Sequence, residues 1–184
     1  MSGLSFPIRT TRLALRPHAL DDVEPLLAYY ADPKVARYIP WEPWSRQDAE
    51  EKVRQRISRT GIVDASSILG LVVEREGRVI GDVVLWPADE TLSRGEVGWA
   101  FHPAVTGKGF ATEAAQALFG VAFDHYGMHR LVAHVDARNV ASARLCERLR
   151  MTKEAHLRKD HWAKGEWTDN VIYGLLAEEW DNRA

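Results

Sequence analysis

A glycine-rich turn at residues 107–114 carries the clearest chemical signal in the chain. It reads Gly-Lys-Gly-Phe-Ala-Thr-Glu-Ala and lies between a strand-like run at 96–101 and a stretch with helical apolar periodicity. Glycine lets a backbone approach a ligand closely, and the first amides of a helix have no partner within the helix. Because the helix dipole favours negative charge at this end, the turn predicts an anion site. The alternative interpretation is a tight strand-to-helix turn that needs only flexible residues.

Two common nucleotide-binding motifs do not fit this turn. A Walker A loop requires a first glycine where the chain has His102, and a serine or threonine where it has Gly109. A dinucleotide fingerprint requires a third small residue where the chain has Thr112, and it follows the first strand of its unit. A ligand that carries phosphate in another form is the remaining interpretation.

The turn resembles the pyrophosphate loop of the GNAT superfamily of acyl-CoA-dependent N-acetyltransferases. That loop reads Gln/Arg-x-x-Gly-x-Gly/Ala, which residues 106–111 match except that Thr106 replaces the usual Gln or Arg. The change removes a side chain that often buttresses the loop and leaves the backbone donors intact. Further features make the chain resemble the RimJ/RimL-like branch, which acetylates protein N-termini and other amines. They are the Arg-Leu-Ala-Leu-Arg-Pro run at 12–17, Asn139-x-x-Ser142, and a closing hairpin with Trp167-x-Asp169 that ends in Glu179-Trp180.

This resemblance implies that acetyl-CoA is the acyl donor. In the family, the strand ending at 101–102 and the following parallel strand at 130–135 splay apart. Backbone groups at 100–102 are then left unpaired, to hold the pantetheine arm and the thioester carbonyl. The expected cofactor-binding residues are Ala100, Phe101, His102, Gly107, Lys108, Gly109, Phe110, Ala111, Thr112, Asn139 and Ser142.

Asn139 and Ser142 open a predicted helix and share one of its faces with Cys146. A purely structural interpretation is that Asn139 caps the helix and Ser142 helps to satisfy its first turn. In RimJ/RimL-like enzymes the matching asparagine contacts the cofactor and the matching serine lies near its sulfur. The resemblance therefore implies a catalytic role for Ser142, as a hydrogen-bond donor to the departing thiolate. Cys146, the only cysteine, is expected to fill the core instead of acting as a nucleophile.

Glu96 is the second candidate catalytic residue, because an acceptor amine must lose a proton during the reaction. On an alternating strand Glu96 shares a face with Gly98 and Ala100, which leave room beside its carboxylate. The alternative is an ordinary exposed carboxylate on a strand. We also expect Glu96 to bind the substrate, together with Trp41, Trp44 and Trp162.

The roles of several neighbouring residues are less specific. Trp41 and Trp44 lie on a proline-stiffened loop, which suits either a lid over a site or a loop pinned to the domain. Glu113 is expected to serve the helix dipole, and His102, next to Pro103, is expected to act mainly through its backbone. The seven histidines do not cluster at ligand spacing, so no metal site is predicted.

The composition narrows the class of protein. With 184 residues, of which 46% are hydrophobic, the chain is long enough for one well-cored domain, expected over 1–184, and short for two. A formal net charge of −2 argues against a nucleic-acid partner, and no apolar run approaches the roughly 20 residues that cross a bilayer. Arg9 and Arg12 interrupt any signal core, and the lone cysteine fits a cytoplasmic location. The sequence leaves a homodimer open.

Periodicity and turn signals outline the elements that must position these residues. Strands are predicted at 12–16, 68–74, 79–86, 96–101, 130–135, 152–162 and 167–176. Helices are predicted from Asp21 or Asp22, from Ser45 to about 59, after the glycine turn, and from Asn139 to about 150, with one further turn at 35–39. Together with the resemblance, this gives an α/β fold of the GNAT type. Its sheet would be mixed, mostly antiparallel and six- to seven-stranded, with a central parallel splayed pair and about four flanking helices.

Two functions from different classes remain. The first is an acetyl-CoA-dependent N-acetyltransferase, which transfers the acetyl group to a primary amine by direct attack in a ternary complex. The acceptor would be a protein N-terminal α-amine or a small-molecule amine. The second is a non-catalytic acyl-CoA-binding sensor or scaffold with the same fold. Thr106 favours the second function slightly, whereas the presence of both Asn139 and Ser142 favours the first.

Overall fold

One mixed sheet of eight strands organises the computed structural model, which describes residues 3–181. The strand order is β1-β2-β3-β4-β5-β6-β8-β7, and β5 and β6 form the one parallel pair within that sheet. The strands are β1 (Ile8–Arg9), β2 (Ala14–Pro17), β3 (Leu69–Arg75), β4 (Arg78–Pro87), β5 (Arg94–Phe101), β6 (Arg130–Asp136), β7 (Thr152–Ala163) and β8 (Glu166–Leu176).

The predicted fold class is confirmed, and the sheet has one strand more than expected. The extra strand is β1, which pairs with β2 through Ile8 and Arg9 only. Two residues are too few for an alternating pattern, so periodicity could not detect it. β2 starts later than predicted, because a turn bond from the Thr10 amide to the Leu13 carbonyl still holds the chain at 10–13.

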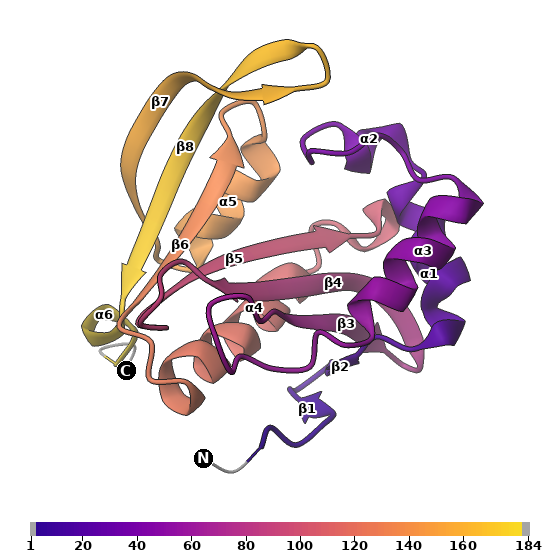
Figure 1. Ribbon diagram of the computed structural model, residues 1–184, viewed down its shortest axis with the longest axis horizontal. Coiled ribbons are helices and arrows are strands. Elements are labelled where there is room, and N and C mark those ends of the chain that lie inside the picture. The colour runs from indigo at the N-terminus through magenta and orange to yellow at the C-terminus, as the bar shows by residue number, and fades with distance from the viewer. Residues whose placement is uncertain (1–2, 182–184) are drawn as a thin grey trace.

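Helices cover both faces of the sheet (Figure 1). They are η1 (Leu20–Asp22), α1 (Val23–Tyr30), α2 (Pro33–Ala36), α3 (Arg46–Arg56), η2 (Pro103–Val105), α4 (Phe110–Gly120), η3 (Val121–His125), α5 (Val140–Arg148) and α6 (Ala177–Asp181). The apolar stripe of α4 is buried at Ala114, Leu118 and Phe119, which join the larger core cluster. On the other face, α1 and α3 bury Leu26 and Val53 in a second cluster. Over residues 3–181, no helix combines the length and the apolar character needed to cross a membrane.

The helix starts show which capping predictions hold. The capping box is confirmed: the Ser45 hydroxyl accepts from the Asp48 amide at 3.2 Å, and the Asp48 carboxylate accepts from the Ser45 amide at 2.9 Å. The predicted aspartate cap of the first helix is wrong for Asp22. Its carboxylate accepts two hydrogen bonds from the Arg16 guanidinium, at 2.8 and 2.9 Å, and makes no cap bond to α1.

The sheet opens between β5 and β6. Their pairing covers only Arg94 to Glu96 on β5, against Arg130 to Val132 on β6. Beyond Glu96 the two strands diverge, and Figure 1 shows β6 rising away from β5 together with β7, β8 and α5. The predicted splayed pair is therefore present, and it separates the sheet into two halves with a gap between them.

Candidate active site

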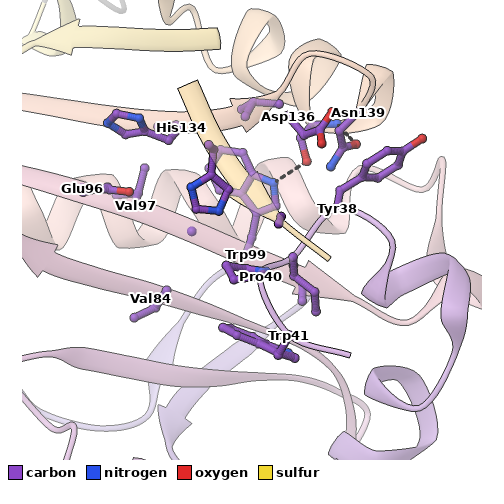
Figure 2. A pocket seen from close by; sticks show the side chains of 18 of the residues that line it. Tyr38, Pro40, Trp41, Val84, Glu96, Val97, Trp99, His134, Asp136 and Asn139 are labelled. Carbon is purple, nitrogen blue, oxygen red and sulfur yellow. Dashed lines mark hydrogen bonds between the residues drawn. The ribbon is translucent and has the colours of Figure 1, made fainter. Parts of the chain in front are cut away.

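A cavity of about 690 Å³ occupies the gap between β5 and β6. Its wall takes Glu96, Gly98 and Ala100 from one face of β5 and Trp99 from the other face, so the cavity reaches both sides of the sheet. In Figure 2, Glu96 and His134 lie on one side of Trp99, and Asn139 lies on the other side. A small molecule that enters from one face can therefore meet one that enters from the opposite face.

Hydrogen bonds to the β4 segment at the two ends of β5 determine which backbone groups of β5 face the gap. The His102 amide donates to the Ile80 carbonyl at 2.9 Å, and the Ala88 amide donates to the Arg94 carbonyl at 2.8 Å. In an antiparallel pair the bonded residues alternate, and the register between β4 and β5 has no shift. Ala100 therefore also turns its backbone toward β4, together with His102.

Trp99 and Phe101 turn their backbone groups toward the gap, by the same alternation. The expectation of free backbone groups at Ala100 and His102 is wrong, because Ala100 and the His102 amide bond to β4, and the His102 carbonyl accepts from the Val105 amide at 3.1 Å. The expected orientation toward the gap holds for the Phe101 backbone. The same orientation of the Trp99 backbone was not predicted from the sequence. Alternate residues of β5 turn their backbone groups toward β4 or toward the gap. The sequence alone does not show which set bonds to β4.

The glycine turn has the conformation that an anion site requires. Gly107 and Gly109 both have positive φ, at 78° and 79°, and Gly109 is the N-cap of α4. No acceptor outside α4 is found, within residues 3–181, for the amides from Gly107 to Thr112. The first amides of α4 also lack a partner inside the helix. This cradle of free N–H groups fits a phosphate group on geometry alone.

Arg12 buttresses the turn from the β1–β2 connection. Its guanidinium donates to the Lys108 carbonyl at 3.1 Å and to the Glu113 carboxylate at 2.6 Å, and it lies 4.6 Å from the centre of the Phe110 ring. Glu113 also accepts from the Thr10 hydroxyl at 2.6 Å. Burial acts to raise the pKa of Glu113, but the hydrogen bonds from Thr10 and Arg12 lower it overall. Arg12 thus provides loop support that Thr106 does not provide.

Ser142 lies in the cavity wall with its hydroxyl held by a tryptophan. The Trp99 indole N–H donates to the Ser142 oxygen at 3.3 Å, which leaves the hydroxyl hydrogen available for another acceptor. Asn139 caps α5, because its side-chain oxygen accepts from the Ser142 amide at 3.1 Å. Capping and the cavity position are compatible, since both residues line the cavity. The contact of Trp99 with Ser142 was not predicted from the sequence, although strand alternation placed Trp99 on the same face as Val97 and Phe101.

Glu96 lies in the cavity wall, half-buried, at the point where β5 and β6 separate. Burial raises the pKa of its carboxyl group, and the His134 charge and a hydrogen bond with the Trp86 side chain partly oppose this shift. No ion-pair partner of Glu96 is found among residues 3–181. Glu96 is thus a carboxylate poised to exchange a proton with a ligand in the cavity.

The three tryptophans predicted to bind substrate have three different places. Trp41 lines the cavity, and its contact with the substrate stays a prediction. Trp44 is only 3% exposed and stacks on Tyr30 with ring centres 4.0 Å apart, so its predicted substrate contact is wrong and the residue is structural. Trp162 faces Trp167 across the hairpin, as the turn predicted, with ring centres 5.4 Å apart. It is absent from the cavity wall, because alternation points its neighbours His161 and Ala163 inward instead.

The remaining candidates are structural. Cys146 is fully buried, and burial raises the pKa of its thiol to about 12, which agrees with the predicted core role. The His102 ring caps η2 by accepting from the Ala104 amide at 3.1 Å. Among residues 3–181, no group of three or more histidine, cysteine, aspartate or glutamate residues could hold a metal ion.

Comparison with known proteins assigns the family. The acetyltransferase (GNAT) domain family matches residues 12–152. The chain belongs to the GNAT acetyltransferase family. This confirms the predicted enzyme class, an acyltransferase, and its donor, acetyl-CoA. The uncharacterized N-acetyltransferase YnaD of Bacillus subtilis (strain 168) is 30% identical over 176 residues, which cover 95% of this chain and 99% of that protein.

Solved structures show the same architecture. The crystal structure of a GNAT-family acetyltransferase from Bacillus anthracis has a TM-score of 0.85 and 28% identity, and covers 94% of this chain and 99% of that chain. RimL, a ribosomal L7/L12 alpha-N-protein acetyltransferase solved with coenzyme A, has a TM-score of 0.82. It is 16% identical and covers 95% of this chain and 99% of its own, a likeness that concerns the fold.

Proposed function

We propose that this chain transfers the acetyl group of acetyl-CoA directly to a primary amine, with both substrates bound at once in the β5–β6 gap. The observation that carries this proposal is the cavity itself. It joins Glu96, on one face of β5, to Trp99 and Ser142, which meet on the other face. A thioester bound from one face would therefore be open to an amine that arrives from the other face.

Acetyl-CoA would be held mainly by main-chain atoms. The pyrophosphate would be bound by the free amides of Gly107 to Thr112, at the start of α4. The pantetheine arm would pair with the gap-facing backbone groups of Trp99 and Phe101. When bound, acetyl-CoA supplies a thioester carbonyl that accepts the amine nitrogen and a thiolate that leaves.

Glu96 would take up the proton of the acceptor amine. An ammonium group carries no lone pair, so the acceptor must lose a proton before its nitrogen can bond to carbon. The Glu96 carboxylate forms no ion pair within residues 3–181 and lines the cavity, where an amine bound in the gap can reach it. Since burial raises the pKa of Glu96, its carboxylate is also a better base than an exposed one.

Ser142 would stabilise the departing thiolate with a hydrogen bond. The Trp99 N–H occupies a lone pair of the Ser142 oxygen and so directs the hydroxyl hydrogen elsewhere. A thiol has a pKa of about 8.5, so its thiolate leaves tolerably without an acid, and the help of a hydroxyl is modest. The serine is a supporting group in this proposal, while alignment of the two substrates provides most of the rate.

The acceptors of the relatives define the test. The spermidine N-acetyltransferase of Vibrio cholerae was solved with CoA and spermine, and RimL is named for a protein α-amine. The experiment is a CoA-release assay with acetyl-CoA and three acceptor sets: small amines, amino acids, and peptides with free N-termini. Turnover of any set above the hydrolysis of acetyl-CoA supports the proposal.

Tight CoA binding by calorimetry with no turnover of any acceptor would instead favour the sensor or scaffold. The Arg12 contact to the Lys108 carbonyl weakens the argument for that second function, because Arg12 supports the loop in place of the Gln or Arg that Thr106 replaces.

A further inference from the structure

Five of the charged side chains in the cavity wall form ion pairs with one another. The Arg56 guanidinium donates to the Asp82 carboxylate at 2.6 Å, and both groups are buried. At the other end, Arg138 forms ion pairs with Asp136 at 2.8 Å and with Glu166 at 2.7 Å. Arg56 and Asp82 cancel, and Arg138 faces two carboxylates, so these pairs leave no free cation for an anionic ligand. A cation that binds such a ligand must come from outside them.

Arg59 is outside these pairs. It lines the cavity and is partly buried, and its guanidinium has no hydrogen-bond or ion-pair partner within residues 3–181. Burial and the neighbouring Arg56 charge lower the pKa of Arg59 more than the Asp82 charge raises it, and a guanidinium stays charged at neutral pH. A cation that is partly removed from water and has no ion-pair partner is stabilised by an anion that reaches it.

The position of Arg59 is on the Glu96 side of the sheet, across the cavity floor from the gap. A Cβ built on Gly70 of β3 would lie 3.5 Å from the Arg59 Cβ, so the arginine stem packs directly over this glycine. Gly70 pairs with Val84, and Val84 pairs with Gly98 of β5. Gly70, which contacts the Arg59 side chain, therefore lies two strand spacings, about 10 Å, from β5, the strand that borders the gap. Val84 lies between the two glycines, and its side chain and the Trp86 ring form this floor together with them.

Two further cations in the cavity wall support the same preference for an anionic ligand. Arg37 and Lys164 also line the cavity, and neither forms an ion pair with a carboxylate within residues 3–181. The Lys164 ammonium donates to the Ala36 carbonyl at 2.6 Å, and the Arg37 guanidinium lies 5.2 Å from the centre of the Tyr38 ring. Glu96 is the lining carboxylate without an ion-pair partner in the same range. Among the lining side chains that form no ion pair within residues 3–181, Arg37, Arg59 and Lys164 are cations and Glu96 is a carboxylate.

We propose that the acceptor is a small amine that also carries an anionic group, of the amino-acid class, and that Arg59 binds this group. The inference rests on the proposed acetyl transfer. The acceptor amine lies at the gap beside Glu96, and its carboxylate or phosphonate extends over Val84 toward Arg59. A polyamine would instead bring a second positive charge toward Arg59, which electrostatic repulsion disfavours.

Matched acceptors test this proposal. Each acid is compared with the amine that lacks only its carboxylate: leucine with 3-methylbutylamine, phenylalanine with 2-phenylethylamine, and 5-aminopentanoate with butylamine. Spermidine is the polycationic comparison. For at least one pair, we expect kcat/KM for the acid to exceed that for the plain amine by about tenfold or more, the usual scale of a charge-assisted hydrogen bond.

Variants assign that preference to Arg59. Arg59→Gln should reduce the preference for the acid to about twofold or less, while turnover of the plain amine changes less than about threefold. Arg59→Lys should restore part of the preference. The matched control is Arg54→Gln, which removes an equal charge from an exposed arginine of α3 that pairs with Glu50 and does not line the cavity. It should leave the preference unchanged.

The outcomes separate the two proposals. Equal or better turnover of the plain amines or of spermidine overturns the acidic acceptor and leaves acetyl transfer standing. An equal loss for acid and amine in Arg59→Gln gives Arg59 a structural role and also overturns the proposal. If no acceptor reacts, calorimetry of each acid with the CoA-bound protein decides. Binding that disappears in Arg59→Gln supports the anion site, although the proposed transfer fails, and no binding overturns both.

Discussion

The two ends of the active site are built in different ways. The CoA end consists of main-chain amides from one continuous stretch, Gly107 to Thr112, and its shape depends on two glycines. The acceptor end consists of side chains that β5, β6, α3 and several loops bring together. Backbone amides are the same whatever the side chains, so the CoA end tolerates changes such as Thr106. The acceptor end changes its chemistry with each substitution, and there the family can vary its substrates.

The largest expected effect tests the CoA end through Gly109. Gly109→Asp adds a side chain at a φ of 79° and places a negative charge where the pyrophosphate would bind. Repulsion at short range should weaken CoA binding on the order of a hundredfold, measured by calorimetry.

Gly109→Asn is the matched control, because it has the same shape and no charge and also tolerates this conformation. It should lose far less affinity than Gly109→Asp. A folded Gly109→Asp protein with wild-type affinity for CoA would remove the anion from this turn.

The second effect tests the acceptor end through Glu96. Burial raises the pKa of Glu96, so its carboxylate is charged, and able to accept a proton, only above that raised pKa. Free amines have a pKa of roughly 8 to 10. Glu96→Gln should therefore lower kcat by about tenfold to a hundredfold between these two pKa values, where the amine still carries its proton.

The loss in Glu96→Gln should shrink at high pH, where the amine is already neutral, and also below the Glu96 pKa, where the wild-type carboxyl is protonated. A pH–rate profile of the variant that overlays the wild type would exclude Glu96 from proton transfer.

A somewhat smaller effect is expected at Ser142, where the two ends meet. Ser142→Ala removes the hydrogen bond to the developing thiolate and should slow turnover by about tenfold, more in kcat than in the KM for acetyl-CoA. Alanine suits the helix, so α5 should remain folded. Wild-type kcat, with chemistry shown to be rate-limiting, would leave Ser142 with a structural role only.

Trp99 should act through Ser142 and have a smaller effect. Trp99→Phe removes the N–H that holds the Ser142 oxygen at 3.3 Å, and should lower kcat by about threefold. In the Ser142→Ala background the same change should have no further effect, because the group it positions is gone. Equal losses in both backgrounds would show that Trp99 acts on its own, for example by packing.

The smallest expected effect concerns Lys108 at the CoA end, and it tests whether main-chain amides or side-chain charge bind the phosphates. The Lys108 ammonium donates to the Ala104 carbonyl at 3.2 Å, so its side chain is turned along the loop. If amides carry the binding, Lys108→Ala should change the affinity for CoA by only about twofold. A loss as large as that of Gly109→Asp would show that side-chain charge binds the phosphates, and the contrast between the two ends would fail.

Sequence reasoning succeeded where a structure is local. The glycine turn, the capping box at Ser45 and the Trp162–Trp167 pair each depend on residues close together in the chain, and all three took the expected geometry. The splay of β5 and β6 came from the family resemblance, and the structure contains it.

What the sequence could not give depends on long-range contacts. Arg12 reaches the Lys108 carbonyl across the fold, and Arg59 is held beside β3 because its carbonyl accepts from the Gly70 amide at 2.8 Å. Trp44 looked like Trp41 in the sequence, three residues away on the same loop, yet one indole is buried against Tyr30 and the other lines the cavity. Such differences follow from the packing of α1 and α3, which no local pattern records.

The burial of Cys146 has a practical consequence for all of these measurements. Thiol-reactive dyes, which report released CoA, also label accessible protein thiols. This chain has a single cysteine, fully buried and with a thiol pKa of about 12, so the folded enzyme itself should give almost no colour. A dye signal before acetyl-CoA is added would therefore report unfolded protein, which makes the activity assay its own control for the integrity of each variant. A second cysteine, placed on the exposed hairpin at Trp162, would accept a probe at one known position.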